Sequence, residues 1–357
     1  MATPEQVIKD AVVRYEREQD RYLKLATRVA DICRIDIVEA NAIRAQVTFR
    51  AKSPRSLEAK LRRFAKRADK DMPAVDAVFE QIGDLAAVRV TTYRPEDKER
   101  VVEEIRKLFS GGHAPDVEID VKDKLKDGGF YRATHCQAAL RDDELVGTCE
   151  NLKGTSCEIQ VCSMMAHVFN EVEHDIVYKP QGGGPQDAEK GLIQALGHLT
   201  RTGDALVTQL LAANELRLKE QAGDFNDAFD FVARMRKEFP DVDLSGNSGQ
   251  LFDELRMLRL TSLERLKQDI GEERFKAAEG SAIVDAFNAY VRETKDTDFL
   301  LDGKSSDLIL ALLLDKHAGQ IEENHPAGRG MGRPPRIRSI ASRFNEFRRQ
   351  APKGPAG

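Results

Sequence analysis

The chain has 357 residues, 41% of them hydrophobic and 32% charged, with a formal net charge of -5 at pH 7. This composition is typical of a folded protein of roughly two domains, and the acidic balance excludes bulk electrostatic binding of nucleic acid or anionic lipid. No apolar run approaches the roughly 20 residues that span a bilayer, and the N-terminus lacks the apolar core of a signal peptide. The five cysteines have no CxxC spacing, which indicates buried free thiols. We therefore expect a cytoplasmic protein with no membrane partner.

The N-terminal part predicts a helix, a strand and a second helix. Apolar residues recur at spacings of three and four from Pro4 to about Ala40, which predicts a long amphipathic helix. A short strand is expected at Gln46–Arg50, and Ser53 followed by Pro54 is typical of a helix start.

Residues 50–70 concentrate positive charge in this acidic protein. They hold nine Lys or Arg residues against two acidic ones. Most charge runs are solvated helix faces. Here, however, cations at a strand end lie beside a helix N-terminus, which itself favours phosphate. We therefore favour a polyphosphate site.

The middle of the chain predicts alternating strands and helices. Further strands are expected, in chain order, at Ala86–Thr92, Val117–Val121, Tyr131–Leu140 and Cys157–Cys162. A helix is expected at Pro95–Leu108 and another from Met164, where the apolar period lengthens to that of a helix. The fold class is therefore α+β, with a mixed β-sheet of about five strands flanked by helices.

The last third predicts helices followed by a basic tail. Helices are expected at residues 187–221, 225–239, 250–268, 272–294 and 306–323. From Asn324 onward eight Lys or Arg residues oppose one Glu, a Gly- and Pro-rich composition that predicts disorder and either a solubilising role or contact with RNA. We divide the chain into residues 1–222, a helical domain of unknown role at 223–323, and the tail at 324–357.

Four separated motifs resemble one family. They are R-A-K-S-x-x-S-L-x-x-K from Arg50, I-G-D-L-A-A-V-R from Ile82, Y-R-A-T-H from Tyr131, and E-I-Q-V with H-x-F-x-E-x-E-H-x-x-x-Y-K from Glu158 to Lys179. Together they resemble the synthetase domain of the RelA/SpoT alarmone synthetases. Only about 45 residues precede the first strand, so we expect the small type, without an upstream hydrolase domain.

The resemblance implies a nucleotidyltransferase-like fold that moves the β,γ-pyrophosphate of ATP to the ribose 3′-hydroxyl of GDP or GTP, making (p)ppGpp. It implies that Asp84 and Glu158 are the catalytic residues and the ligands of Mg²⁺, an ion that suits carboxylate oxygens and substrate phosphates. The implied ATP-binding residues are Arg50, Lys52, Ser56, Lys60 and Arg89. The implied acceptor-binding residues are Lys126, Tyr131, His135 and Gln160, with Tyr131 stacking on the base.

Three positions depart from the family pattern, namely Phe130 in place of Gly, Cys162 in place of Arg and Phe169 in place of Trp. The altered loop at Phe130 and the basic tail leave open a toxin-type relative that pyrophosphorylates the 3′ end of tRNA or makes adenosine alarmones. Cys162 leaves open a catalytically silent nucleotide-binding regulator, and a homo-oligomer is possible. The spacing of His167, Glu171 and His174 would also allow a metal triad, although such residues are more often structural.

Overall fold

The computed structural model describes residues 3–67, 72–112, 114–124, 129–178, 184–219, 221–295, 299–325 and 336–350. Lys126 lies outside these ranges. Contacts divide the chain into two compact units, the first made of Met1–Val38 with Ile43–Gln209 and the second of Glu39–Ala42 with Leu210–Gly357. The functional boundaries placed at residues 222 and 323 stay predictions.

The first unit is built on a mixed sheet whose strand order is β1-β2-β6-β5-β3, with β4 also paired to β5. Its strands are β1 (Ala45–Ala51), β2 (Ala86–Thr92), β3 (Ser110–Gly111), β4 (Glu118–Asp123), β5 (Arg132–Ala139) and β6 (Cys157–Ser163). Only the β2–β6 pair is parallel among these six strands, and the other pairs are antiparallel. The predicted mixed sheet is confirmed, with the two-residue strand β3 in addition.

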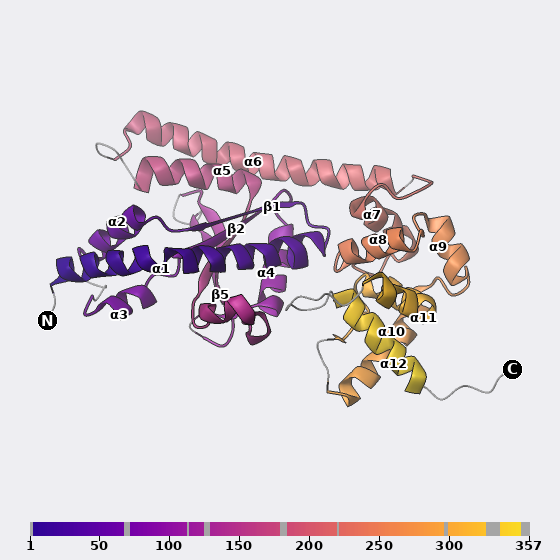
Figure 1. Cartoon of the computed structure of the whole chain (residues 1–357). Helices are drawn as coiled ribbons and strands as arrows, with labels where there is room; N and C mark the ends of the chain where they lie inside the picture. Colours follow the sequence, from indigo (N-terminus) through magenta and orange to yellow (C-terminus); the bar gives the residue numbers. More distant parts are fainter. Residues whose placement is uncertain are drawn as a thin grey trace. The chain divides into compact units, whose positions relative to one another are not determined.

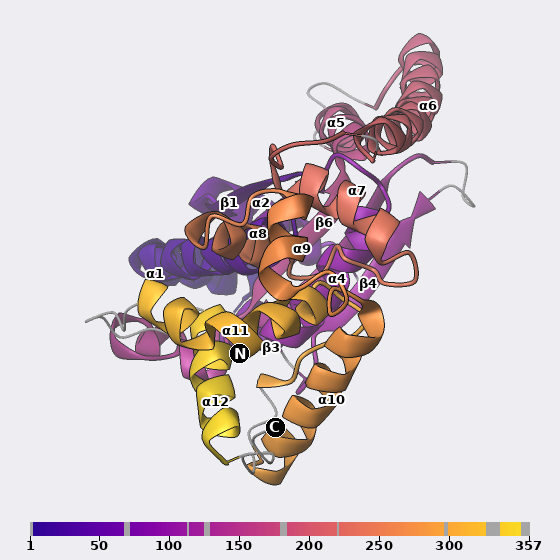
Figure 2. The same cartoon turned by 90° about the vertical axis from the view of Figure 1, so that its right-hand side faces the viewer.

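Helices of the first unit flank this sheet. They are α1 (Pro4–Ile32), α2 (Pro54–Phe64), α3 (Val75–Glu80), α4 (Asp97–Leu108), α5 (Met164–Glu173) and the part of α6 (Asp187–Leu218) that precedes Leu210. Two π-helical segments continue helices of this unit, Cys33–Glu39 after α1 and His174–Tyr178 after α5. Short 3-10 turns occupy Asp142–Glu144 and Gly147–Leu152. The α1 helix packs its buried side chains against the sheet in the main core of this unit. The α5 and α6 helices lie side by side in both views (Figure 1, Figure 2).

The strand register gathers polar side chains into rows on the other face of the sheet. Because directly opposed residues point to the same face, Ala87 of β2, Glu158 of β6 and Gln137 of β5 form one row. The next row contains Arg89, Gln160 and His135 in the same strand order. The opposite face carries alternating apolar residues of the same strands, all buried in the core, such as Val88, Val90, Ile159 and Val161. The period-two patterns therefore separate a core face from a polar face.

Leucines whose spacing predicted the α6 helix are exposed in the structure. Leu192, Leu199 and Leu206 recur every seven residues, and their exposed fractions are 71%, 64% and 59%. The side of α6 that is buried instead contains Gly197, Thr200 and Asp204. Helical spacing was therefore a sound predictor of the helix and a poor predictor of which face is covered.

The second unit is helical, as predicted. Its helices are α7 (Ala228–Glu238), α8 (Ser248–Met257), α9 (Leu263–Ile270), α10 (Ala277–Glu293), α11 (Asp307–Asn324) and α12 (Arg336–Gln350). The single helix expected at residues 250–268 is two helices, because Arg259 adopts a left-handed φ of 60° and Ser262 caps a new helix by accepting a hydrogen bond from the Arg265 backbone N–H.

The expectation of a disordered tail is wrong for residues 336–350. Ile337, Ile340, Ala341 and Phe344 recur at helical spacing in α12 and are buried in the core of the second unit. The burial of these four side chains compensates the conformational entropy that is lost when the segment is ordered. The Arg- and Gly-rich composition around them indicated that no such compensation was available.

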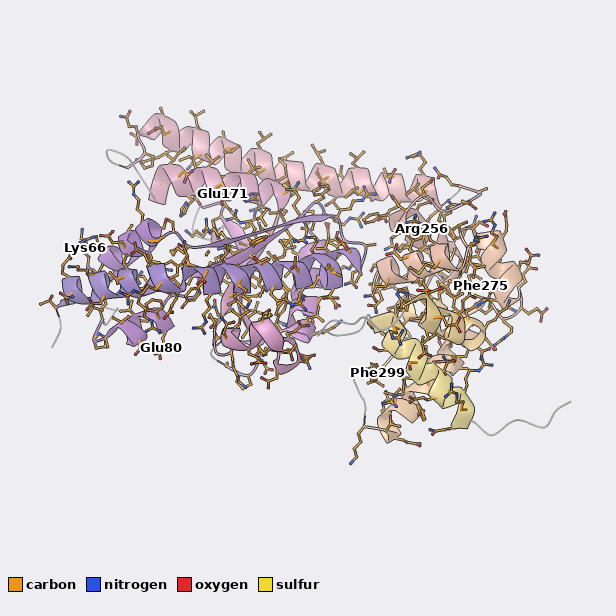
Figure 3. The ribbon with its side chains drawn as sticks, viewed as in Figure 1. Lys66, Glu80, Glu171, Arg256, Phe275 and Phe299 are labelled. Carbon is orange, nitrogen blue, oxygen red and sulfur yellow. The ribbon has the colours of Figure 1, made fainter. Side chains whose placement is uncertain are left out.

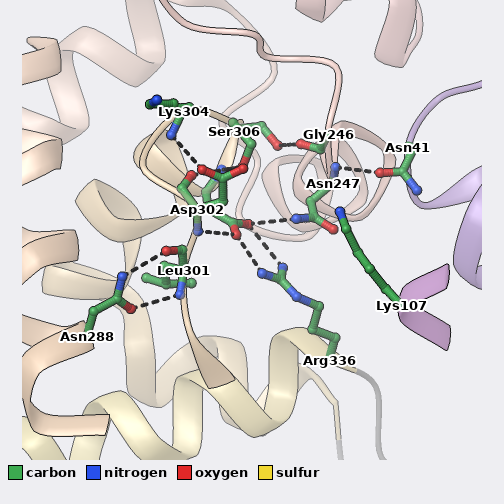
Figure 4. A network of polar contacts seen from close by, with 12 residues as sticks. Asn41, Lys107, Gly246, Asn247, Asn288, Leu301, Asp302, Lys304, Ser306 and Arg336 are labelled. Carbon is green, nitrogen blue, oxygen red and sulfur yellow. Dashed lines mark hydrogen bonds and ion pairs between the residues drawn. The ribbon is translucent and has the colours of Figure 1, made fainter. Parts of the chain in front are cut away.

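A polar network joins the start of α8 to the start of α11 within the second unit (Figure 4). The buried carboxylate of Asp307 accepts hydrogen bonds from the Asn247 side chain at 3.2 Å and from Arg336 at 3.0 and 2.5 Å. The Asn247 backbone N–H donates to Oδ1 of Asn41 at 3.0 Å, and the Gly249 N–H donates to the carbonyl of Ala40 at 2.9 Å. The short segment Glu39–Ala42 thus satisfies backbone donors at the first turn of α8.

Candidate functional site

One cleft on the polar face of the sheet collects every predicted site residue that the structure describes. Its volume is about 1410 Å³. It is lined by Arg50, Lys52, Ser56, Lys60, Asp84, Arg89, Tyr131, His135, Glu158 and Gln160. Motifs that are up to 110 residues apart in the chain therefore meet in one place, and Lys126 is the only predicted member outside the described residues.

Asp84 lies between two lysines. Its Oδ2 is 2.5 Å from Nζ of Lys52, and its Oδ1 is 2.8 Å from Nζ of Lys60. Burial alone would raise the pKa of Asp84, but the two ammonium groups outweigh burial and lower that pKa to about 2. The carboxylate is therefore ionised throughout the neutral range.

Lys52 is itself largely buried at the end of β1. Burial lowers its pKa, and the charge of Asp84 opposes that shift. Its carbonyl accepts a hydrogen bond at 2.6 Å from the hydroxyl of Tyr15, a fully buried residue of α1. The hydrogen bond from Tyr15 of α1 therefore fixes the backbone of Lys52 at the end of β1.

The α2 helix begins at the same edge of the cleft. Ser53 is its N-cap, as predicted, and its Oγ accepts from the Ser56 backbone N–H at 3.2 Å. The side chains of Arg55 and Arg63 line the cleft together with Ser56. A helix N-terminus and several cations here form an electropositive wall that suits a polyphosphate.

Glu158 faces the other side of the cleft. Nδ1 of His135 is 3.3 Å from its Oε2, and Nε2 of Gln160 donates to its Oε1 at 2.5 Å. Burial raises the pKa of Glu158, but hydrogen bonding and charge from His135, together with the Gln160 hydrogen bond, outweigh burial and lower it. Glu158 is thus an ionised carboxylate whose surroundings differ from those of Asp84.

A chain of contacts extends from Glu158 in both directions. Nε2 of His135 is 2.9 Å from the Tyr131 hydroxyl. Which of these two groups donates the hydrogen depends on the tautomer of His135. On the other side, Oε1 of Gln160 accepts from Arg89 at 3.3 Å, and Arg89 forms an ion pair at 2.7 Å with Glu171. Glu171 is labelled on α5 in Figure 3.

The site fits a divalent cation held with substrate. Two carboxylates, Asp84 and Glu158, line the same cleft, and the charge of Asp84 is near enough to act on the pKa of Glu158. Mg²⁺ is usually bound through one or two carboxylates plus phosphate oxygens and water, so this donor set is suitable. Across the described ranges, no three His, Cys, Asp or Glu side chains are close enough together to hold a metal ion. His167, Glu171 and His174 therefore do not form the metal triad that their spacing would allow.

The departures from the family pattern have packing explanations. Phe130 is 7% exposed and packs edge-on against Phe169 and His198, with ring centroids 5.8 and 4.7 Å apart. A Cβ on Gly197 would lie 2.2 Å from the Phe130 ring, so that glycine makes the space for the larger residue. Cys162 is 2% exposed, and burial raises its pKa to about 11, so it is an uncharged thiol in place of a cation.

Sequence reasoning missed three contributors to the site. The spacing of Glu171 allows a structural role or a metal ligand, and the structure makes it the ion-pair partner of Arg89. No local pattern assigns a site role to Tyr15 or Gln137, because each donates a hydrogen bond to a backbone carbonyl far away in the sequence. The odd-numbered alternation of β5 placed Gln137 on the face of His135, and that was the one available signal.

Comparisons with known proteins agree with the placement of the motifs. Residues 49–183 match the family described as the region found in RelA / SpoT proteins. The comparison with curated proteins gave no match.

Three solved structures align with about half of the chain. A GTP pyrophosphokinase family protein from Streptococcus pneumoniae is 20% identical, with a TM-score of 0.43, over 55% of this chain and 92% of that one. Small alarmone synthetase 1 from Bacillus subtilis is 20% identical, with a TM-score of 0.42, over 55% and 97%. Small alarmone synthetase 2 from Bacillus subtilis is 22% identical, with a TM-score of 0.41, over 56% and 98%.

The family match covers all four sequence motifs and every residue that lines the cleft. None of the helices in the described part of the chain is long and apolar enough to cross a membrane. The chain therefore contains a region, residues 49–183, that matches the family model of RelA / SpoT proteins, in agreement with the resemblance of the four motifs.

Proposed function

We propose that this enzyme transfers the β,γ-pyrophosphate of ATP to the ribose 3′-hydroxyl of GDP or GTP and so makes (p)ppGpp. The observation that carries the proposal is that the two carboxylates of the cleft have different surroundings. Asp84 is surrounded by cations beside a helix N-terminus, whereas Glu158 is bound to His135 and, through it, to Tyr131. One side suits a triphosphate and the other suits a nucleoside hydroxyl.

The donor side would hold ATP through charge. Lys52 and Lys60 neutralise phosphate oxygens, Arg50 extends the same wall, and the first turn of α2 at Ser56 offers a hydroxyl. Asp84 and Glu158 would hold Mg²⁺, which would supply further charge neutralisation for the phosphates. Positioning and neutralisation are the main requirements of phosphoryl-group transfer.

The acceptor side would activate the hydroxyl. Glu158 takes the proton from the 3′-hydroxyl, the oxygen forms a bond to the β-phosphorus of ATP, and the bond from that phosphorus to the oxygen bridging the α-phosphate breaks, releasing AMP. Tyr131 stacks on the acceptor base, and His135 keeps Glu158 ionised and oriented. Lys126 stays a predicted contact of the acceptor.

Two features that favoured a tRNA acceptor have structural explanations. Phe130 packs in the core beside Gly197 rather than lining the cleft. Arginines of α12 bind groups of the second unit, since Arg336 pairs with Asp307, Arg338 donates to the Glu322 carbonyl and Arg343 pairs with Glu346. Guanosine nucleotides are therefore the acceptors we favour.

The test is a transfer assay with ATP labelled at the γ-phosphate and GDP, GTP, ATP or tRNA offered separately. We expect label in guanosine penta- or tetraphosphate and AMP in equal amount. Asp84→Asn and Glu158→Gln should abolish transfer, which would also exclude a silent regulator. Label reaching tRNA alone would refute the proposed acceptor, and no transfer to any acceptor would refute the reaction.

A further inference from the structure

The side chain of Gln137 spans the two segments that carry the catalytic carboxylates. Gln137 is the direct partner of Glu158 in the β5–β6 register, so the two side chains are neighbours on the cleft face. Its Nε2 donates to the carbonyl of Gly83 at 3.0 Å, and Gly83 immediately precedes Asp84. The same Nε2 donates to Oγ of Ser156, two residues before Glu158, at 2.9 Å. Both protons of the amide are therefore used.

Close packing restricts the Gln137 side chain to this arrangement. A Cβ on Gly83 would lie 2.5 Å from Oε1 of Gln137, so the amide lies directly against the glycine backbone. A Cβ on Gly112 would lie 3.0 Å from Cγ of Gln137 and 2.7 Å from Cβ of Ser156. Two glycines thus provide the space in which the amide is held, and alternative rotamers of Gln137 have little room.

We propose that Gln137 is a positioning residue that sets where Asp84 stands relative to Glu158. This inference rests on the proposed reaction for its consequence in catalysis, although the contact itself does not depend on it. Asp84 lies in the turn before β2. The Gly83 carbonyl in the same turn accepts a hydrogen bond from Gln137 of β5, the strand that pairs with the strand of Glu158. A ligand carboxylate displaced by a fraction of an ångström loses much of its effect on transfer.

The variant Gln137→Met tests the proposal because it keeps the length of the side chain and removes the amide. We expect kcat to fall by about tenfold and the Mg²⁺ concentration for half-maximal rate to rise, while the KM for the acceptor stays within about twofold. Hydrogen exchange should become faster in the turn at residues 83–85 and stay unchanged in β5 and β6. Gln81→Met is the matched control, since Gln81 also donates to a backbone carbonyl, that of Ala77, at 3.0 Å.

A milder variant covers the case in which Gln137→Met does not fold. Ser156→Ala removes one of the two acceptors of the amide, and a smaller change in the same direction is expected. Unchanged kcat together with unchanged exchange in the turn overturns the proposal, as does an exchange increase spread over the whole sheet. If the wild-type chain transfers label to no acceptor while exchange still rises in the turn alone, the proposed reaction fails and the positioning contact stands.

Discussion

His135 and Glu158 are joined by a contact of 3.3 Å between Nδ1 and Oε2, across neighbouring antiparallel strands. This contact lowers the pKa of Glu158 against the effect of burial. In His135→Ala burial would remain without the opposing hydrogen bond, so the pKa of Glu158 should rise. We expect the acidic limb of the kcat profile to move to higher pH. Tyr131→Phe keeps His135 and should leave that limb in place, and a limb unmoved in His135→Ala would contradict the role of Glu158 as base.

Asp84 should contribute to stability in a pH-dependent way. Its pKa falls from an ordinary 3.8 to about 2 on folding, which corresponds to about 2 kcal/mol. A group with a depressed folded pKa stabilises the fold above its unfolded pKa and loses that contribution as the pH falls toward about 2. The difference in unfolding free energy between wild type and Asp84→Asn should therefore be constant above pH 5 and shrink between pH 4 and pH 2. Urea unfolding at each pH measures it, and a constant difference would contradict the ion pairs.

Tyr131 has two separable roles. If its ring stacks on the acceptor base, Tyr131→Ala should raise the acceptor KM by roughly tenfold, the equivalent of about 1–2 kcal/mol of stacking. Tyr131→Phe keeps the ring and loses only the hydroxyl near His135, so its acceptor KM should change by less than about threefold. Equal effects of the two variants on KM would show that the hydroxyl, rather than the ring, recognises the acceptor.

The buried hydroxyl of Tyr15 should matter for stability. Tyr15→Phe removes the 2.6 Å hydrogen bond to the carbonyl of Lys52, and the contact from Gln19 that remains is longer, at 3.3 Å. We expect a loss of about 1 kcal/mol in unfolding free energy, measured by urea denaturation. Tyr22→Phe on the same helix is the control. A Tyr15→Phe variant as stable as the wild type would mean that water replaces the lost donor.

Gly249 should not tolerate a side chain. A Cβ there would lie 1.8 Å from the carbonyl oxygen of Glu39, a backbone atom that cannot rotate away. Gly249→Ala should lower the free energy of unfolding of the second unit by about 1–3 kcal/mol. Gly319→Ala in α11 is the matched control, because nothing lies within 4 Å of its Cβ and alanine favours a helix. Thermal unfolding of the two variants should shift in opposite directions.

The sequence was most informative where local chemistry decides the structure. Alternation predicted the strands, Ser53 and Pro54 predicted the start of α2, and the motifs placed Asp84 and Glu158 in one cleft. It was least informative where a distant segment decides. The hydrogen bond from Gln137 to Gly83 joins residues 54 positions apart, and no local pattern encodes it.

The helical region shows the same limit. The left-handed backbone at Arg259, which separates α8 from α9, occurs at a residue that rarely adopts it. The order of α12 depends on the partners of Ile337 and Phe344 in the core of the second unit, whereas composition alone indicated disorder.

The segment Glu39–Ala42 has a consequence for how the chain is made. The second unit is complete only when these early residues join the helices that follow Leu210. On a ribosome, four residues of that unit are therefore synthesised about 170 residues before the rest of it. A fragment that starts at Leu210 would leave the backbone N–H groups of Asn247 and Gly249 without their acceptors, so the C-terminal helices should be expressed together with the N-terminal segment.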